Sequence, residues 1–200
     1  MSSAPQRRYT EAEYLAIERS AATKHEFFRG EIFAMSGASR QHNRITVNVS
    51  ALLHAQLKGG DCEHFASDMR VKIPSTGLYT YPDCAITCEN PRFEDEILDT
   101  LLNPQIVIEV LSDSTEKYDR GKKFEHYRSI PSLREYILIS QDHAHIDRFV
   151  LNEQGQWALT DATGLEASIE LTAINCRLPL AEVYAKVEFE PTPEPSPWDK

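Results

Sequence analysis

The segment 104–111 constrains the fold more than any other part of the chain. It reads Pro-Gln-Ile-Val-Ile-Glu-Val-Leu, a nearly unbroken apolar run. Such a run is typical of a strand that is covered on both faces. Glu109 interrupts it, and a carboxylate buried without a partner costs several kcal/mol. The sequence therefore predicts a central buried strand with a cation or a hydrogen-bonded site beside Glu109.

The remaining elements follow from periodicity and from helix-capping and turn signals. We expect a short helix opening at Thr10, two short strands folded about Arg29-Gly30, a long helix over 39–58 and a helix over 115–130. A short helix near 180–187 closes the unit. Further strands are expected at 62–66, 69–73, 82–87, 105–111, 134–140, 143–151 and 156–160. This order favours the α/β class, in its mixed α+β form, with a central mixed sheet flanked by helices.

The chain length fits one domain. With 200 residues, we place a single folded domain over 7–187. The last segment, 188–200, is acidic and holds four prolines, which block helices and strand ladders alike. It is therefore predicted to be a disordered tail.

Charge and cysteine usage bear on partners and compartment. The net charge of −10 argues against non-specific coating of nucleic acid or of anionic membranes. No apolar run approaches the ~20 residues of a membrane span, and the first ten residues lack a signal-peptide core. The four cysteines (Cys62, Cys84, Cys88 and Cys176) have no zinc-site spacing, so we expect reduced structural thiols. These features predict a soluble cytoplasmic protein.

Two acidic residues stand at strand ends that can meet at one edge of the sheet. Asp83 follows Pro82 at the start of the strand 82–87, and Glu109 lies near the end of the strand 105–111. Two converging carboxylates with a backbone carbonyl suit Mg²⁺, which prefers oxygen ligands and keeps several waters. The residues alone leave an alternative open, in which Glu109 pairs with a basic side chain and Asp83 caps a turn.

The helix over 115–130 adds a lysine that faces the core. At 100° per residue, Lys123 falls on the buried face and Lys122 on the solvent face. Asp119, Lys123 and Tyr127 form one row of the helix. Because the helix starts just after Glu109, its first turns lie over the end of that strand. Lys123 is therefore either half of a structural ion pair or an active-site cation.

Three weaker signals each have two interpretations. His42 lies on the apolar face of the long helix and is either a core histidine or a substrate contact. Ser112 precedes a helix and either contacts a phosphate or caps that helix. His143, His145 and Asp147 share one face of a strand, at a spacing that metals use, but an exposed edge explains them as well.

Several motifs together resemble a known family. They are Y-x-Y-P-D over 79–83, P-x-x-V-I-E-V-L-S-x-S-T over 104–115, D-x-x-x-K-x-x-x-Y over 119–127 and E-Y-I-L-I over 135–139. The earlier T-x-x-E-Y, E-x-x-x-G-E-I and S-x-x-H-N-x-I pieces fit the same pattern. This ordered set resembles the Uma-type restriction endonucleases (domain of unknown function 820) of the PD-(D/E)XK nuclease superfamily. The resemblance covers about residues 9–187.

The resemblance implies a restriction-endonuclease-like core and metal-dependent cleavage of phosphodiester bonds in DNA. It further implies Mg²⁺ or Mn²⁺ as the cofactor and a homodimer as the assembly. Carried over residue by residue, it makes Asp83 and Glu109 metal ligands, with the Val110 carbonyl as a third. Ser112 and His42 are then candidates for substrate binding.

In one respect the chain departs from the superfamily pattern. The lysine usually stands two residues after the glutamate, where this chain has Leu111. The family places it on the following helix, and the matching position is Lys123, which would act on the attacking water and on developing charge. Glu26 matches an early acidic residue that assists the metal site, although Glu31 is nearby.

Two rival functions remain at this stage. One is a non-catalytic nucleic-acid-binding or accessory protein that keeps the nuclease fold, which the net charge and the displaced lysine favour. The other is a structural oligomer with a buried Glu109–Lys123 ion pair.

Overall fold

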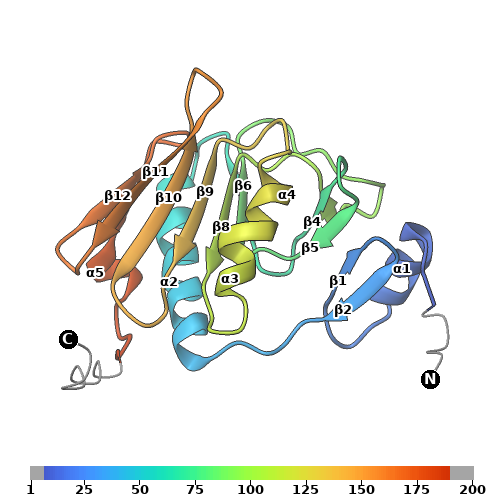
Figure 1. The fold of residues 1–200 in the computed structure, drawn as a ribbon. Helices are drawn as coiled ribbons and strands as arrows, with labels where there is room; N and C mark the ends of the chain where they lie inside the picture. Colours follow the sequence, from blue (N-terminus) through green and yellow to red (C-terminus); the bar gives the residue numbers. More distant parts are fainter. Residues whose placement is uncertain (1–6, 190–200) are drawn as a thin grey trace.

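Strand β8 (Ile106–Val110) lies inside a six-stranded sheet, where the apolar run of the sequence places it. The computed structural model describes residues 7–189 (Figure 1). Every residue of β8 is buried, and the strand pairs with β6 antiparallel and with β9 parallel. Most of the predicted tail, 190–200, lies outside the described residues. Phe189 packs its ring against Tyr184.

The six-stranded sheet has the order β11-β10-β9-β8-β6-β3. Its strands are β3 (Glu63–Ala66), β6 (Cys84–Thr87), β8, β9 (Glu135–Ile139), β10 (His145–Leu151) and β11 (Trp157–Thr163). Each was expected from the sequence. A five-stranded sheet, ordered β2-β1-β5-β4-β7, contains β1 (His25–Phe28), β2 (Glu31–Ala34), β4 (Arg70–Ile73), β5 (Leu78–Thr80) and β7 (Thr100–Leu101). Strands β12 (Ser168–Leu171) and β13 (Cys176–Pro179) form a separate hairpin.

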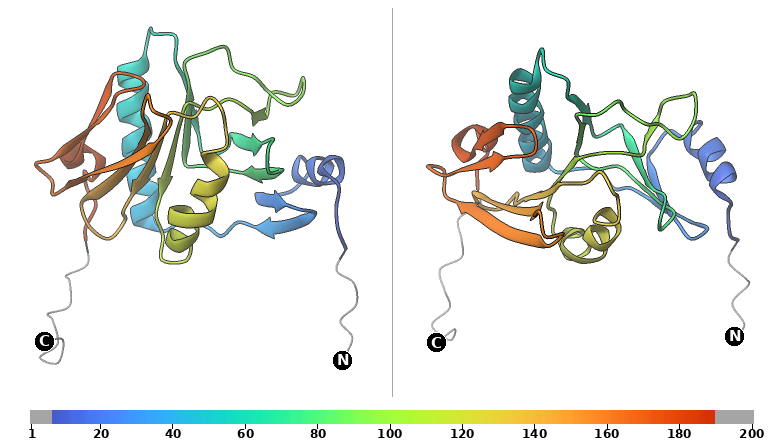
Figure 2. Two further views of the ribbon diagram at one scale, coloured as in Figure 1. Left: turned by 45° about the horizontal axis from the view of Figure 1, so that its top comes forward. Right: turned by 90° about the horizontal axis from the view of Figure 1, so that it is seen from above.

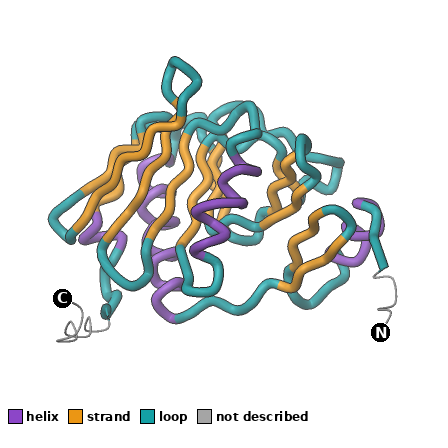
Figure 3. Tube along the Cα trace, viewed as in Figure 1, coloured by secondary structure: helices purple, strands orange, loops and turns teal. Residues whose placement is uncertain are grey.

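Helices cover both faces of the six-stranded sheet (Figures 1 and 2). Helix α2 (Arg40–Leu57) packs its buried residues on one face, where they form a core with β6, β8, β9 and β10. The opposite face is covered by one helical stretch made of α3 (Glu116–Tyr118), a π-helical turn η1 (Asp119–Lys123) and α4 (Phe124–Tyr127). Figure 3 shows the strands between these helices, with the α3–α4 stretch in front of them and α2 behind. The expected mixed sheet flanked by helices is therefore present, in the mixed α+β class.

The N-terminal helix α1 (Glu11–Glu18) joins the five-stranded sheet through buried polar contacts. Its start is the capping box that the sequence predicts, with Thr10 and Glu13 bonded reciprocally. At its end, Glu18 accepts a hydrogen bond from Tyr81 and contacts His25. The last helix, α5 (Leu180–Val183), is shorter than the predicted 180–187.

The expectation of four reduced cysteines is wrong for two of them. Cys62 and Cys88 form a disulfide, while Cys84 and Cys176 are free and buried. The reason is the register of two neighbouring strands. Glu63 pairs with Thr87 at the edge of the sheet, so the next residues outward, Cys62 and Cys88, face each other. Their separation of 26 residues resembles no sequence motif.

Candidate active site

Asp83 directly precedes the first residue of β6 and lies beside β8. The register of these strands pairs Cys84 with Ile108, so continuing it by one residue brings Asp83 opposite Glu109. The Val110 N–H donates to Asp83 Oδ2 over 2.7 Å. In a sheet, such a backbone N–H normally donates to a carbonyl of the neighbouring strand. Here the Asp83 carboxylate takes the place of that carbonyl as the acceptor.

His42 reaches the same carboxylate from α2. Its Nε2 lies 3.3 Å from Asp83 Oδ2, and both side chains are only 14–16% exposed. Burial lowers the pKa of His42, but the hydrogen bond to Asp83 and the charge of that carboxylate outweigh it, so the net shift is upward. The prediction that His42 points inward is confirmed, and the structure brings it to the candidate site.

Glu109 and Lys123 form a buried pair on the other side of β8. Lys123 Nζ lies 2.9 Å from Glu109 Oε1, and the Tyr127 hydroxyl donates to the same oxygen over 2.9 Å. The Lys123 side chain is 7% exposed, whereas that of Lys122 is 75% exposed. The predicted orientation of the two neighbouring lysines is therefore confirmed.

Two further carboxylates surround Lys123. Asp119 Oδ1 lies 3.4 Å from the ammonium, and Glu26 Oε1 lies 3.7 Å from it. Glu26 reaches the site from β1, where it also accepts a short hydrogen bond from Thr80. Glu31, the neighbouring candidate, instead pairs with Arg8. The structure thus favours Glu26 over Glu31 as the acidic residue contributed by this hairpin.

Negative charge exceeds positive charge in this cluster. Four carboxylates (Glu26, Asp83, Glu109 and Asp119) surround one lysine and one histidine. Burial is the main cause that raises the pKa of Glu109 to about 8, and Asp119 and Asp83 raise it further against the opposing effect of Lys123. Burial lowers the pKa of Lys123, but Glu109, Asp119 and Glu26 more than compensate and hold it well above its ordinary value. Glu109 and Lys123 therefore both hold their protons to a higher pH than they would in water.

Hard divalent cations prefer oxygen ligands, and Asp83 and Glu109 are the carboxylates of the cluster that can offer such oxygens. The contacts of Asp83 go to Oδ2 and those of Glu109 go to Oε1, so Asp83 Oδ1 and Glu109 Oε2 are the oxygens suited to a cation. Within residues 7–189, no group of three or more His, Cys, Asp or Glu side chains is arranged to hold a metal ion. Mg²⁺ fits a two-carboxylate site because it commonly takes one or two carboxylates and keeps its waters.

Ser112 does not reach the cluster directly. Its hydroxyl contacts the hydroxyls of Ser114 and Thr115, at 3.2 and 2.9 Å. Thr115 lies near Asp119 and lowers the pKa of that carboxyl against the larger, opposing effect of burial. A direct contact of Ser112 with substrate stays a prediction.

His143, which precedes β10, and His145 of that strand form a separate cluster with Asp147. The exposed edge considered from the sequence is wrong, because β10 lies between β9 and β11 and Asp147 is buried. His145 Nε2 contacts Asp147 Oδ1 at 3.1 Å, and Asp147 also pairs with Arg120. The His143 and His145 rings stack 5.5 Å apart. These polar contacts account for the spacing seen in the sequence.

Sequence reasoning did not assign site roles to Asp119, Tyr127 and Thr80. Asp119 and Tyr127 are each four residues from Lys123, so they lie on the same face of the helix. This spacing is the sequence signal that could have assigned them to the site. Thr80 belongs to β5, a three-residue strand that the sequence pattern did not indicate. Its contact with Glu26 depends on strand pairing between distant segments.

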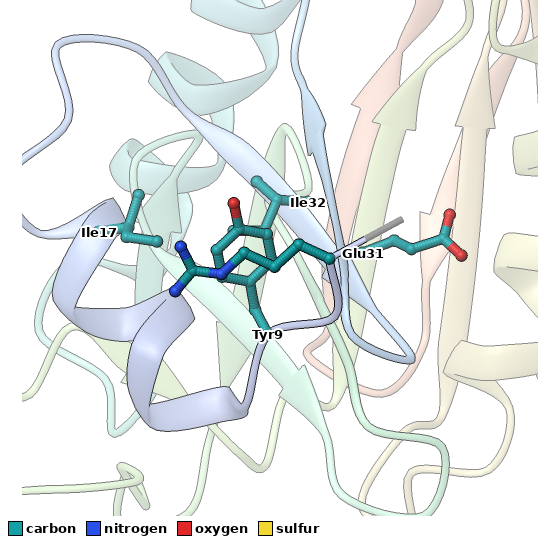
Figure 4. Close-up of a pocket in the computed structure, with 5 residues that line it drawn as sticks. Tyr9, Ile17, Glu31 and Ile32 are labelled. Carbon is teal, nitrogen blue, oxygen red and sulfur yellow. The ribbon is translucent and has the colours of Figure 1, made fainter. Parts of the chain in front are cut away.

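A surface hollow lies away from this cluster. It measures about 360 Å³ and is lined by Arg7, Tyr9, Ile17, Glu31 and Ile32, between α1 and β2 (Figure 4). None of these residues belongs to the carboxylate cluster. No helix within residues 7–189 combines the length and apolar character needed to cross a membrane.

Comparison with known proteins shows where this fold occurs. The chain is similar to a crystal structure described as a putative nuclease of DUF820 from Anabaena variabilis ATCC 29413. The TM-score is 0.70 at 18% identity, over 86% of this chain and 96% of the other. This likeness shows a shared fold.

Two cyanobacterial relatives are similar in sequence. The uncharacterized protein sll1609 of Synechocystis sp. is 41% identical over 82% of this chain and 92% of its own length. The uncharacterized protein slr1290 of the same strain is 38% identical over 94% and 97%. The family model Uma2, described as "Putative restriction endonuclease", matches residues 11–181. The chain therefore belongs to the Uma2 family.

Proposed function

We propose that the protein is a Mg²⁺- or Mn²⁺-dependent endonuclease that hydrolyses phosphodiester bonds in DNA. The observation that carries this proposal is the cluster at the end of β8. There, Asp83 and Glu109 are each fixed through one oxygen, beside a buried lysine and an excess of carboxylates. Family membership and the nuclease-like fold support the reaction class.

Asp83 and Glu109 would hold the cation, with the Val110 carbonyl as a further ligand. Bound there, a divalent cation supplies Lewis-acid stabilisation of a phosphoryl oxygen and acidifies a bound water. Asp83 is kept in place by the Val110 N–H and by His42. The Tyr127 hydroxyl orients Glu109 by donating a hydrogen bond to its Oε1. Each ligand is therefore oriented before substrate arrives.

Lys123 would stabilise negative charge on the phosphate in the transition state. Its raised pKa keeps the ammonium protonated, which suits electrostatic stabilisation better than proton abstraction from water. Glu26, Asp83 and His42 are the more accessible members of the cluster, with side chains 14–18% exposed. Substrate would approach from their side.

The first test is cleavage of supercoiled plasmid DNA. Mg²⁺ or Mn²⁺ should support nicking or cutting, and EDTA should abolish it. Asp83→Asn and Glu109→Gln should each lower the rate by about a hundredfold or more, because each removes a ligand of the Lewis acid. Glu31→Gln is the matched control, since it changes a carboxylate outside the cluster. Equal activity of Asp83→Asn and wild type would refute the assignment.

The second test separates catalysis from an accessory role. Isothermal calorimetry should detect Mn²⁺ binding to wild type and its loss in Asp83→Asn. If intact, folded protein binds no Mn²⁺ at millimolar concentration, the accessory protein of the same fold becomes the better assignment. The homodimer implied by the resemblance is part of this proposal, and analytical ultracentrifugation tests it directly.

A further inference from the structure

Lys123 has more than one carboxylate partner. Its ammonium lies 2.9 Å from Glu109, 3.4 Å from Asp119 and 3.7 Å from Glu26. The three partners differ in what else they bind. Glu109 also accepts from Tyr127, and Glu26 accepts from Thr80. The proposed function additionally assigns Glu109 to the metal.

Asp119 is the partner whose orientation is dedicated to this lysine. It begins the π-helical turn that ends at Lys123, and such turns occur frequently at functional sites. Its side chain is 3% exposed, and within residues 7–189 its Oδ1 accepts no hydrogen bond of regular geometry. That buried oxygen is the one that lies 3.4 Å from the ammonium. Thr115, one turn earlier, donates no hydrogen bond of regular geometry to that oxygen.

A cation on Glu109 changes the surroundings of Lys123. The Lys123 ammonium and a divalent ion would then both contact the Glu109 carboxylate. Two positive charges bound to one carboxylate repel each other strongly in a buried site. The lysine stays in place only if another buried anion holds it. Glu26 is farther away and more exposed, at 18%, so Asp119 is the better anchor.

We propose that Asp119 is the positioning residue that keeps the Lys123 ammonium in the site when Glu109 binds a divalent cation. This inference rests on the proposed function. It predicts that the lysine shifts its main ion pair from Glu109 to Asp119 on metal loading. Asp119 itself makes no contact with the metal in this arrangement.

The test is acetic-anhydride labelling of lysines, read by fragment mass spectrometry, in EDTA and in saturating Mn²⁺. Lys122, with its exposed side chain, is the internal reference in the same peptide. In wild type, Lys123 labelling should change by less than about twofold on Mn²⁺ loading, because its ion pair is exchanged and not lost. In Asp119→Asn, it should be low in EDTA and rise about tenfold with Mn²⁺, since the ammonium then lacks a buried partner.

The matched control is Glu125→Gln, which removes the carboxylate paired with Lys122 on the same helix. It should leave Lys123 labelling unchanged in both conditions. If Asp119→Asn folds poorly, Thr115→Val keeps the carboxylate but removes a nearby hydroxyl that lowers its pKa. That variant should give a smaller rise in Lys123 labelling with Mn²⁺.

Calorimetry completes the design. The dissociation constant of Asp119→Asn for Mn²⁺ should lie within about threefold of the wild-type value, because the variant loses a nearby negative charge but keeps every ligand. Loss of Mn²⁺ binding in Asp119→Asn would make Asp119 a ligand and overturn the inference. Equal Lys123 protection in loaded wild type and loaded Asp119→Asn would also overturn it, leaving the proposed function intact. If the wild-type protein binds no Mn²⁺, both this inference and the proposed function are refuted.

Discussion

Glu109 is the residue on which the chemistry of the site converges. It interrupts the most apolar strand of the sheet, and its carboxylate contacts Lys123 and Tyr127 in a volume that water hardly reaches. Its charge is stabilised by one lysine and opposed by burial and by two other carboxylates. A proton and a metal ion would therefore compete to neutralise the charge of the Glu109 carboxylate.

This competition predicts how stability depends on pH. An unfolded glutamate loses its proton near its ordinary pKa of 4.5, whereas folded Glu109 keeps it up to about 8. Between these values the folded state holds one more proton, so raising the pH favours unfolding, by at most about 1.4 kcal/mol per pH unit. Urea melts of metal-free protein from pH 5 to 8 should show this decline, and Glu109→Gln should flatten it. A Glu109→Gln profile parallel to that of wild type would contradict the shift.

Lys123 should contribute to the stability of the metal-free protein. Replacing it by Met strands Glu109 and Asp119 in a buried site, which should lower the free energy of unfolding by about 3 kcal/mol at pH 8. Lys122→Met changes an exposed pair with Glu125, for which about 0.5 kcal/mol or less is expected. Chemical denaturation measures both. Equal effects of the two substitutions would show that Lys123 is solvated.

At the scale of elements, the hairpin β1–β2 delivers Glu26 to the cluster. Its register pairs Phe28 with Glu31, so only Arg29 and Gly30 form the turn. Both have positive φ, at 50° and 84°, as a two-residue hairpin turn requires. The turn residues thereby fix which face of β1 carries Glu26.

Gly30→Ala should disturb this element. A Cβ at residue 30 would lie 3.1 Å from the Arg8 Cβ and 3.3 Å from the Tyr9 carbonyl, at a φ that L-residues avoid. We expect a loss of about 1–2 kcal/mol in unfolding free energy. Gly37→Ala is the control, because nothing lies within 4 Å of its added Cβ. Thermal melts of the two variants make the comparison, and a stable Gly30→Ala protein would argue against the tight turn.

Elements with a strong local signal could be predicted from the sequence. The buried run of β8, the capping box of α1 and the Arg29-Gly30 turn each depend on residues adjacent in the chain. Strands β5 and β7 have three and two residues and exist through pairing with β4, so no local pattern indicates them. The π-helical turn likewise departs from the regular helix expected there, although it keeps Asp119 and Lys123 buried.

The site could be predicted in part for the same reason. Asp83, Glu109 and Lys123 lie in elements that the sequence defines well, and they belong to one cluster. The disulfide between Cys62 and Cys88 depends on register between strands, which sequence spacing alone does not give. The same holds for the contact between Thr80 and Glu26, which join two strands of the other sheet.

At the scale of the whole molecule, the cluster connects both large sheets. Glu26 comes from the five-stranded sheet, Asp83 and Glu109 from the six-stranded sheet, and Lys123 from the helix that covers it. A cation that binds the folded cluster and not the unfolded chain would stabilise the folded state. This stabilisation is a ligand effect that depends on metal concentration.

Mn²⁺ should raise the melting temperature of the wild-type protein. At a hundred times its dissociation constant the gain is about 2.7 kcal/mol, or roughly 5–10 °C for a chain of this size. Asp83→Asn should melt at the same temperature with and without Mn²⁺, while Glu31→Gln should behave as wild type. Calorimetric scans decide the point, and an equal Mn²⁺ response in Asp83→Asn would move the metal elsewhere.

The pairing of β1 with β5, through Phe27 and Tyr79, has a consequence for how the protein is made. Residues separated by some fifty positions must meet before Glu26 can approach Lys123. Closing such long loops is slow, and partial structures gain little from it. On a ribosome, α1, β1 and β2 emerge well before β8 and the lysine-bearing helix exist. A nascent or half-folded chain therefore lacks the assembled carboxylate cluster, and the chemistry proposed here begins only after the lysine-bearing helix has been made and has packed against both sheets.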